Sequence, residues 1–347
     1  MRFKSNLKNA RTFSKLVAAL QSLEKIAWVR LDDETVRFTV IPDTGSQVWA
    51  SFSMDFIFDN YALQSAEPNN TINLELPLGP LQRALKSALN GVSASIRLTK
   101  KDGIPVLSMT ITTTAAPAKD VQGVARFGTV NANAAGRDYD DDDGIFAHET
   151  LETNLHRERE KIITQDIPVR VLHPDTVETI MQPKVREPDV HIQLPPLLQL
   201  KAISDRFTKL ALASRPSTSS SSTASPKLEL SANMHGGLRL RLNTDTLDVE
   251  SQWSGLENPD LDPAQLPCAL EDHPSTRFRE AGPDKWATVR VDGKDWSKVL
   301  SVGRLEGRVI ACFADDHALI MYVYVPQYDD TGAEDSVVTY YVSSYSL

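Results

Sequence analysis

Cysteine is scarce in this chain, which has only Cys268 and Cys312 among its 347 residues. The two lie far apart and neither belongs to a CxxC pair. The sequence therefore argues against a framework of several disulfides and against a structural zinc site, and a reducing compartment suits the chain.

Long apolar runs are missing too. The longest clean ones, such as residues 16–20, are far too short to span a bilayer, so we expect no membrane partner.

Sequence signatures of catalysis are also missing. The chain has no GxxxxGKS/T, GxGxxG, GxSxG or HExxH motif. Its seven histidines are scattered, and His148-Glu149 followed by His156 has the wrong spacing for a zinc-binding helix. The acidic run from Asp138 to Asp143 lacks the alternating ligands of a calcium loop. We therefore predict no catalytic residue, no metal and no cofactor, and do not expect an enzyme.

The net charge of −9 at first disfavours a nucleic-acid partner. The acid is concentrated, however, because residues 116–160 carry a net charge of −5, residues 257–284 another −5, and residues 329–335 −4. The rest of the chain carries a net charge of +5. The acid therefore falls in predicted loops, and the predicted helices and strands are mildly basic.

The length of 347 residues favours two domains or slightly more. In the first half, apolar periodicity predicts a helix over 10–26, with Phe13, Leu16 and Leu20 on one face, and a second helix over 79–90. Runs of β-branched and aromatic residues between turn residues predict strands, which lie at 2–8, 27–32, 35–41, 47–55, 71–76, 94–100, 104–114 and 162–172.

The second half repeats this order of elements. Helices are predicted over 196–212 and 294–303, and strands at 189–194, 227–233, 237–243, 246–253, 286–292, 306–314, 317–326 and 336–345. Consecutive strands with short turns favour antiparallel sheets with the few helices grouped on one face. We therefore predict an α+β fold of two similar domains, 1–172 and 189–347.

Three segments interrupt the repeat and are predicted to be disordered loops: an acidic insertion at 116–160, a Ser-rich loop at 214–226, and an acidic, Pro-rich loop at 256–284. A connector at 173–188 joins the two domains. The first thirty residues are basic and free of acid until Glu24, as a mitochondrial transit peptide would be. Because the same strand–helix order recurs later, we interpret them as part of the fold.

Each of the four predicted helices carries basic residues opposite or beside its apolar stripe. The set comprises Arg11, Lys15, Lys25, Arg83, Lys86, Lys201, Lys209, Lys294 and Lys298. If the helices lie side by side, these residues form a positive surface suited to sequence-independent contact with phosphates. The alternative is an ordinary solvated surface, because lysine and arginine are common on any exposed helix.

Five short segments carry a family resemblance: residues 1–4 (MRFK), 72–76 (INLEL), 81–86 (LQRALK), 164–171 (TQDIPVRV) and 188–195 (PDVHIQLP). In this order they resemble the sliding-clamp superfamily of proliferating cell nuclear antigen, and within it the Hus subunit of the nine-one-one DNA-damage checkpoint clamp. The similarity covers most of the chain outside the three insertions.

The resemblance implies a nuclear, heterotrimeric ring formed with two other clamp-like subunits. Its helices would line a hole with pseudo-six-fold symmetry, the nine basic residues would face double-stranded DNA, and edge strands 162–172 and 246–253 would pair between subunits. An ATP-dependent clamp loader would open the ring, and checkpoint and repair proteins would bind to it. A replication processivity clamp of the same fold and an unrelated two-domain enzyme are the alternatives.

The connector at 173–188 resembles the interdomain loop that borders a partner-peptide groove in this family. Val177, Ile180 and Met181 would line the groove. Alternatively, these apolar side chains pin the connector to the sheet, which ordinary packing favours.

Overall fold

The computed structural model describes residues 1–43, 45–115, 159–178, 180–214, 225–260, 269, 271–326 and 336–345. The predicted insertion at 116–160 and the predicted Ser-rich loop at 214–226 lie almost wholly outside these residues, as do residues 261–268 of the third predicted loop.

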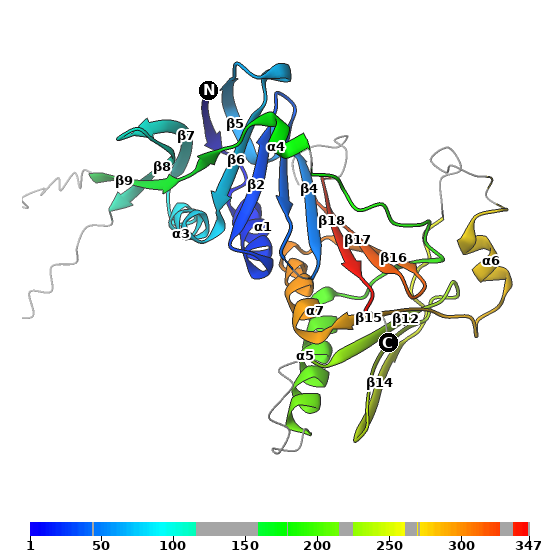
Figure 1. The fold of residues 1–347 in the computed structure, drawn as a ribbon. Coiled ribbons are helices and arrows are strands. Elements are labelled where there is room, and N and C mark those ends of the chain that lie inside the picture. Colours follow the sequence, from blue (N-terminus) through cyan, green and yellow to red (C-terminus); the bar gives the residue numbers. More distant parts are fainter. Residues whose placement is uncertain are drawn as a thin grey trace, which may run out of the picture.

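In the first half, two main helices interrupt a series of strands (Figure 1). The helices are α1 (Ala10–Leu23) and α3 (Leu78–Ala88), with short helical turns α2 (Met54–Ile57) and η1 (Pro68–Asn70). The strands are β1 (Arg2–Leu7), β2 (Ile26–Leu31), β3 (Thr35–Val40), β4 (Gln47–Ser53), β5 (Phe58–Gln64), β6 (Ile72–Pro77), β7 (Ser93–Lys101), β8 (Ile104–Ala115), β9 (Arg159–Pro168) and β10 (Arg170–Val171).

The connector contains the short helix α4 (Pro174–Glu178) and leads into the second half. The helices there are α5 (Leu197–Ala213), α6 (Pro274–Glu280) and α7 (Gly293–Val299), which continues into the 3-10 helix η3 (Leu300–Leu305). The strands are β11 (Val190–Gln193), β12 (Lys227–Ala232), β13 (Leu238–Thr244), β14 (Leu247–Trp253), β15 (Ala287–Asp292), β16 (Arg308–Ala314), β17 (Ala318–Val325) and β18 (Ser336–Ser343).

Strand order shows that the two halves share one topology. The order β1-β7-β8-β9 in the first half corresponds to β11-β16-β17-β18 in the second, and β6-β2-β3-β4 corresponds to β15-β12-β13-β14. The described strand pairs are antiparallel. The predicted α+β fold with antiparallel sheets is therefore confirmed.

One sheet of nine strands runs through both halves. β4 pairs with β18 in antiparallel register, from Val337 opposite Ser51 to Tyr341 opposite Gln47. The central strands β4, β18 and β17 lie next to one another in Figure 1. Backbone hydrogen bonds thus join the two halves without a break, which fixes their relative orientation.

The core lies between the sheets and one layer of helices. The predicted apolar stripe of α1 is buried, including Phe13, Leu16 and Leu20, as is that of α3, including Leu81 and Leu85. Strands β2, β3 and β4 alternate between buried and less buried residues, as expected when one face of a sheet is covered. The same periodicity that predicts these elements therefore places their apolar faces in the core.

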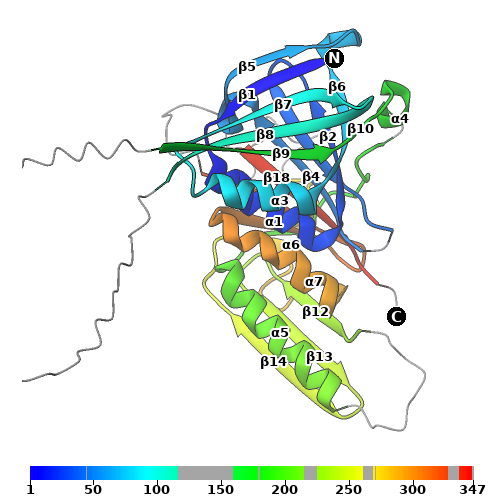
Figure 2. The same cartoon turned by 90° about the vertical axis from the view of Figure 1, so that its left-hand side faces the viewer.

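The helices form one continuous layer in the order α3, α1, α7, α5, as Figure 2 shows. Hydrogen bonds fasten neighbouring helices: Gln82 Nε2 of α3 donates to Ser14 Oγ of α1 at 3.2 Å, and Ser22 Oγ of α1 donates to the carbonyl of Lys298 in α7 at 3.1 Å. Lys201 Nζ of α5 donates to the carbonyl of Ser297 in α7 at 2.6 Å. The side-by-side arrangement that the charged-surface hypothesis requires is present.

Several predicted elements differ from the structure in their bounds. Helix α1 ends at Leu23 because Glu24 is extended, so Lys25 lies in the loop before β2 and not on the helix. The single strand predicted at 162–172 breaks after Pro168, and the amide of Val169 donates to the carbonyl of Pro105 at 3.0 Å as the chain crosses from the five-stranded to the nine-stranded sheet.

The prediction of a loop throughout 256–284 is wrong for residues 274–280, which form α6. Pro274 occupies the first turn, where its missing N–H costs nothing, and the side chain of buried His273 accepts a hydrogen bond from the amide of Ser275 at 3.2 Å. The buried N-cap residue His273 therefore stabilises a helix that the acidic, Pro-rich composition of this segment does not predict.

Candidate nucleic-acid interface

The nine predicted basic residues differ in exposure. Seven are exposed on or beside the helix layer: Arg11, Lys25, Arg83, Lys86, Lys209, Lys294 and Lys298. Lys15 and Lys201 are partly buried. The apolar stripes of α1 and α3 turn toward the sheets, so their exposed cations point away from the core and toward solvent.

Acidic side chains neutralise part of this surface. Lys15 Nζ lies 3.0 Å from Glu306 Oε1, and Lys298 Nζ lies 3.1 Å from Asp295 Oδ1. Lys201 Nζ lies 3.5 Å from an oxygen of Asp205 and is also held by Ser297. These three lysines therefore offer less charge to a phosphate than sequence reasoning assigned to them.

The basic side chains that have no acidic partner are concentrated in the first half. Among the described residues, Arg11, Lys25, Arg83 and Lys86 form no ion pair, and in the second half the same holds for Lys209 and Lys294. Asp205 lies four residues after Lys201 on the same helix and dilutes its charge, as the sequence indicates. Glu306 and Asp295 are the paired acids that sequence reasoning missed. Of these two, only Asp295 has a spacing that could have revealed its pair, because it lies three residues before Lys298.

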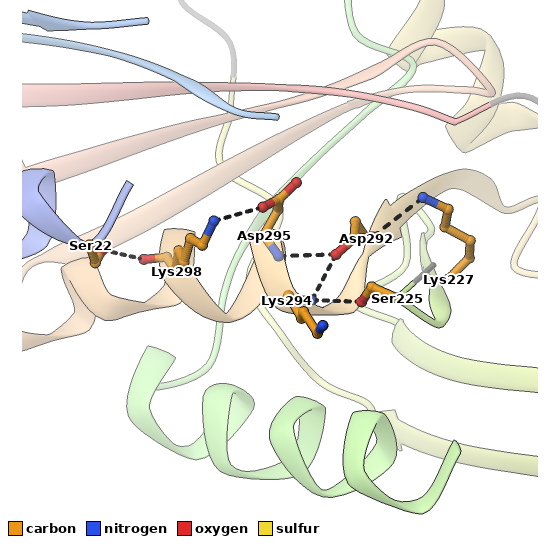
Figure 3. A network of polar contacts seen from close by, with 7 residues as sticks. All are labelled: Ser22, Ser225, Lys227, Asp292, Lys294, Asp295 and Lys298. Atoms are coloured by element: carbon orange, nitrogen blue, oxygen red, sulfur yellow. Dashed lines mark hydrogen bonds and ion pairs between the residues drawn. The ribbon is translucent and has the colours of Figure 1, made fainter. Parts of the chain in front are cut away.

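The start of α7 is held by the polar network in Figure 3. Asp292 Oδ1 caps the helix by accepting from the amides of Lys294 at 2.9 Å and Asp295 at 3.2 Å. Burial by itself raises the pKa of Asp292, but hydrogen bonds from Ser225 and these amides, together with the charge of Lys227, hold that pKa below its ordinary value. The cap therefore stays ionised at neutral pH and fixes the helix that carries Lys294 and Lys298.

Both strands that were predicted to pair between subunits lie at the edges of their sheets. β9 ends the five-stranded sheet and β14 ends the four-stranded sheet, so the edges predicted from 162–172 and 246–253 are edges within the described residues. Ile162 of β9 is 66% exposed, which is unusual for an isoleucine on a strand. An edge strand with an exposed apolar residue is a site for pairing with another chain.

A groove lies between the connector and the outer face of the nine-stranded sheet. Val177, Ile180 and Met181 line it with residues of β2, β3 and β4, around a cavity of about 510 Å³. Met181 is 76% exposed, so it is not pinned to the sheet, whereas Val177 and Ile180 are partly buried. The structure thus brings the three predicted groove residues together.

Polar atoms in the wall of this groove lack hydrogen-bond partners among the described residues. They are Arg30 Nε, Trp49 Nε1 and Asn73 Oδ1, all buried. Because buried polar atoms are normally hydrogen-bonded, two donors and one acceptor here suit an occupant with polar groups of its own.

Within the described ranges, no group of three or more His, Cys, Asp or Glu side chains is placed to hold a metal ion. The described helices are each too short or too polar to cross a bilayer. Burial raises the pKa of the Cys312 thiol to about 12, so this cysteine is not a reactive nucleophile.

Comparison with known proteins places these features in a family. The family model described as "Hus1-like protein" matches residues 1–346. The chain is 34% identical to checkpoint protein hus1 of Schizosaccharomyces pombe over 99% of both chains, and 25% identical to the checkpoint protein hus1 homolog of Dictyostelium discoideum over 99% of this chain and 98% of the relative.

Solved structures share the fold at lower identity. Proliferating cellular nuclear antigen from Entamoeba histolytica is 14% identical, with a TM-score of 0.59 over 99% of this chain and 98% of that one. This likeness confirms the predicted clamp fold. Together with the match to the family model over nearly the whole sequence, it leads to one conclusion: the chain belongs to the Hus1-like protein family.

Proposed function

We propose that this chain is one subunit of a heterotrimeric nine-one-one checkpoint clamp, which encircles DNA at sites of damage in the nucleus and serves as a platform for checkpoint and repair proteins. The observation that carries the proposal is the continuous layer of four helices with exposed cations, flanked by two unpaired sheet edges. In this role the chain acts by encirclement and not by catalysis.

The junction inside the chain supports ring closure. β4 occupies in its sheet the place that β14 occupies in the other half, and β18 occupies the place of β9. Since β4 and β18 pair with each other, their counterparts β14 and β9 are suited to pair in the same antiparallel manner with neighbouring subunits. Repeating this joint around a ring generates pseudo-six-fold symmetry.

A closed ring does not need tight or specific DNA contacts. Screened lysine and arginine charges hold the duplex near the helix layer without reading its sequence, so sliding is permitted. The sequence has no phosphate-binding loop of its own, which supports dependence on a separate ATP-driven loader. The groove beside Val177, Ile180 and Met181 is the proposed docking place for a partner peptide.

The test is co-expression with the two candidate clamp-like partners, followed by size-exclusion chromatography with light scattering. We expect a heterotrimer, and expect Ile162→Asp to prevent its assembly because it places a charge on the pairing edge of β9. Ile104→Asp is the matched control, because Ile104 is 56% exposed and lies at the far end of β8, beyond the last pair with β9.

Equal assembly of both variants would rule out closure through β9. A homotrimer formed by this chain alone would favour the replication processivity clamp instead.

A further inference from the structure

A second cationic surface lies on the outward face of the five-stranded sheet. Strand alternation buries Phe3 on β1 and Leu98 on β7, and leaves Arg2, Lys4 and Arg97 exposed on the other face. Lys4 lies directly opposite Arg97 in the β1–β7 pairing, and Arg2 lies two residues before Lys4 on the same face. We call Arg2, Lys4 and Arg97 the outer basic patch.

The buried face of this sheet packs toward the helices. Phe3 contacts Phe58 with ring centroids 5.2 Å apart, and Phe58 in turn contacts Phe13 of α1 at 6.2 Å. The outer basic patch therefore points away from the helix layer, and a duplex lying against that layer would not reach it.

No acid neutralises the outer basic patch among the described residues. Lys101 provides the contrast, because it belongs to the same strand as Arg97 but has a partner, with its Nζ 2.8 Å from Asp166 Oδ2. Like charges directly opposite each other on a sheet destabilise it, so the Lys4–Arg97 pair is unfavourable by itself. A bound anion would remove that repulsion.

The patch borders a cavity of about 870 Å³. The described residues that line it include four cations, Arg2, Lys4, Arg97 and Lys100, and the neutral hydrogen-bonding residues Gln64 and Thr99, but no aspartate or glutamate. In a chain with a net charge of −9, such a lining is selective for negative charge.

We propose that the outer basic patch binds a phosphorylated, acidic peptide segment of a partner protein. Residues two apart on a strand lie about 7 Å apart and neighbouring strands about 5 Å apart, so the three cations converge on a compact area. A phosphate monoester supplies about two charges and three acceptor oxygens, and arginine can donate to it in bidentate fashion.

Duplex DNA fits this geometry less well. Its phosphates are spaced along an extended backbone, and a protein that follows them needs a stripe of cations longer than three clustered side chains. The inference does not depend on ring assembly, because all the residues involved belong to one chain and to one sheet.

The test uses fluorescence polarisation with the full chain and three labelled probes: the peptide Gly-Asp-Asp-phosphoserine-Glu-Gly, the same peptide without phosphate, and a duplex of 20 base pairs. We expect the phosphopeptide to bind most tightly. Replacement of both cations of the opposed pair, in Lys4→Gln/Arg97→Gln, should weaken its binding about tenfold or more, since charge-assisted hydrogen bonds are lost.

Lys86→Gln is the matched control, because it removes an exposed cation from the helix layer and should leave phosphopeptide binding unchanged. The double variant should not melt at a lower temperature than the parent chain, because it removes a like-charge pair. The proposal is overturned by equal binding of both peptides, by no binding of either, by unchanged affinity in the double variant, or by a loss confined to the duplex.

Discussion

Lys15 of α1 and Glu306, which follows η3, form an ion pair at 3.0 Å across 291 positions of sequence. The pair joins the helix layers of the two halves and also removes one cation from the proposed DNA surface. The side chains are 34% and 66% exposed, so the pair contributes little to folding, about 0.5 kcal/mol or less.

Glu306→Gln should therefore strengthen DNA binding with little change in stability. Freed Lys15 can contact one more phosphate, which makes the plot of log affinity against log salt steeper by about 1. Duplex binding by the assembled clamp, titrated at several salt concentrations, measures this slope. Glu280→Gln in α6 is the control for a general loss of negative charge, and an identical slope in the two variants would contradict the role assigned to Lys15.

The two halves should contribute unequally to DNA binding. Arg83→Gln/Lys86→Gln removes two cations without ion pairs and should flatten the salt slope by about 2. Lys201→Gln/Lys298→Gln removes two lysines that already face Asp205 and Asp295, so its effect should be distinctly smaller. Equal effects in the same salt titration would show that pairing with acids does not decide which lysines reach the duplex.

Trp296 should be a main contributor to the stability of the second half. Its side chain is fully buried, and its Nε1 has no hydrogen-bond partner within the described chain. Trp296→Ala should lower the free energy of unfolding by about 3–5 kcal/mol through the cavity it leaves. Trp296→Phe keeps much of the packing and removes the unpartnered N–H, so its cost should be smaller in urea unfolding. Similar losses in the two variants would refute this account.

Stability should fall on mild acidification because of His191. Burial is the main cause that lowers the pKa of His191 to about 4, below the value of about 6.5 in an unfolded chain. Between these values the unfolded chain binds a proton that the folded chain does not, so stability is present above about pH 6.5 and is lost as pH falls. From pH 7 to pH 5 this contribution falls by about 2 kcal/mol.

His191→Gln should remove that part of the pH dependence, measured as unfolding free energy at pH 7 and pH 5. His317→Gln, at an exposed histidine, is the control. The comparison concerns the change with pH and not the absolute stability, which a buried substitution also alters. An unchanged pH dependence in His191→Gln would assign the effect to other groups.

Sequence periodicity predicts the elements whose apolar faces form the core. The stripe of Phe13, Leu16 and Leu20 is buried as predicted, and the repeated strand–helix order corresponds to the repeated sheet order. Local backbone preference predicts an element less well where tertiary contacts determine whether a helix or strand forms. The break between β9 and β10 and the helix α6 depend on partners distant in sequence or on a buried cap.

The charged surface was predictable only in part for the same reason. Basic residues such as Arg83 and Lys86 lie exposed as their helical positions indicate. The Lys15–Glu306 pair could not be inferred, because periodicity describes one helix at a time and gives no information about which acid a neighbouring segment supplies.

The β4–β18 pairing would determine how the proposed ring opens at this subunit. This junction is tethered by the connector, so a transient rupture heals at the high effective concentration set by a short covalent link. Junctions between separate chains have no such tether and dissociate by dilution. In the proposed ring, only every second joint could therefore act as a gate, and a loader would need to separate one boundary between chains while each subunit moves as a rigid unit.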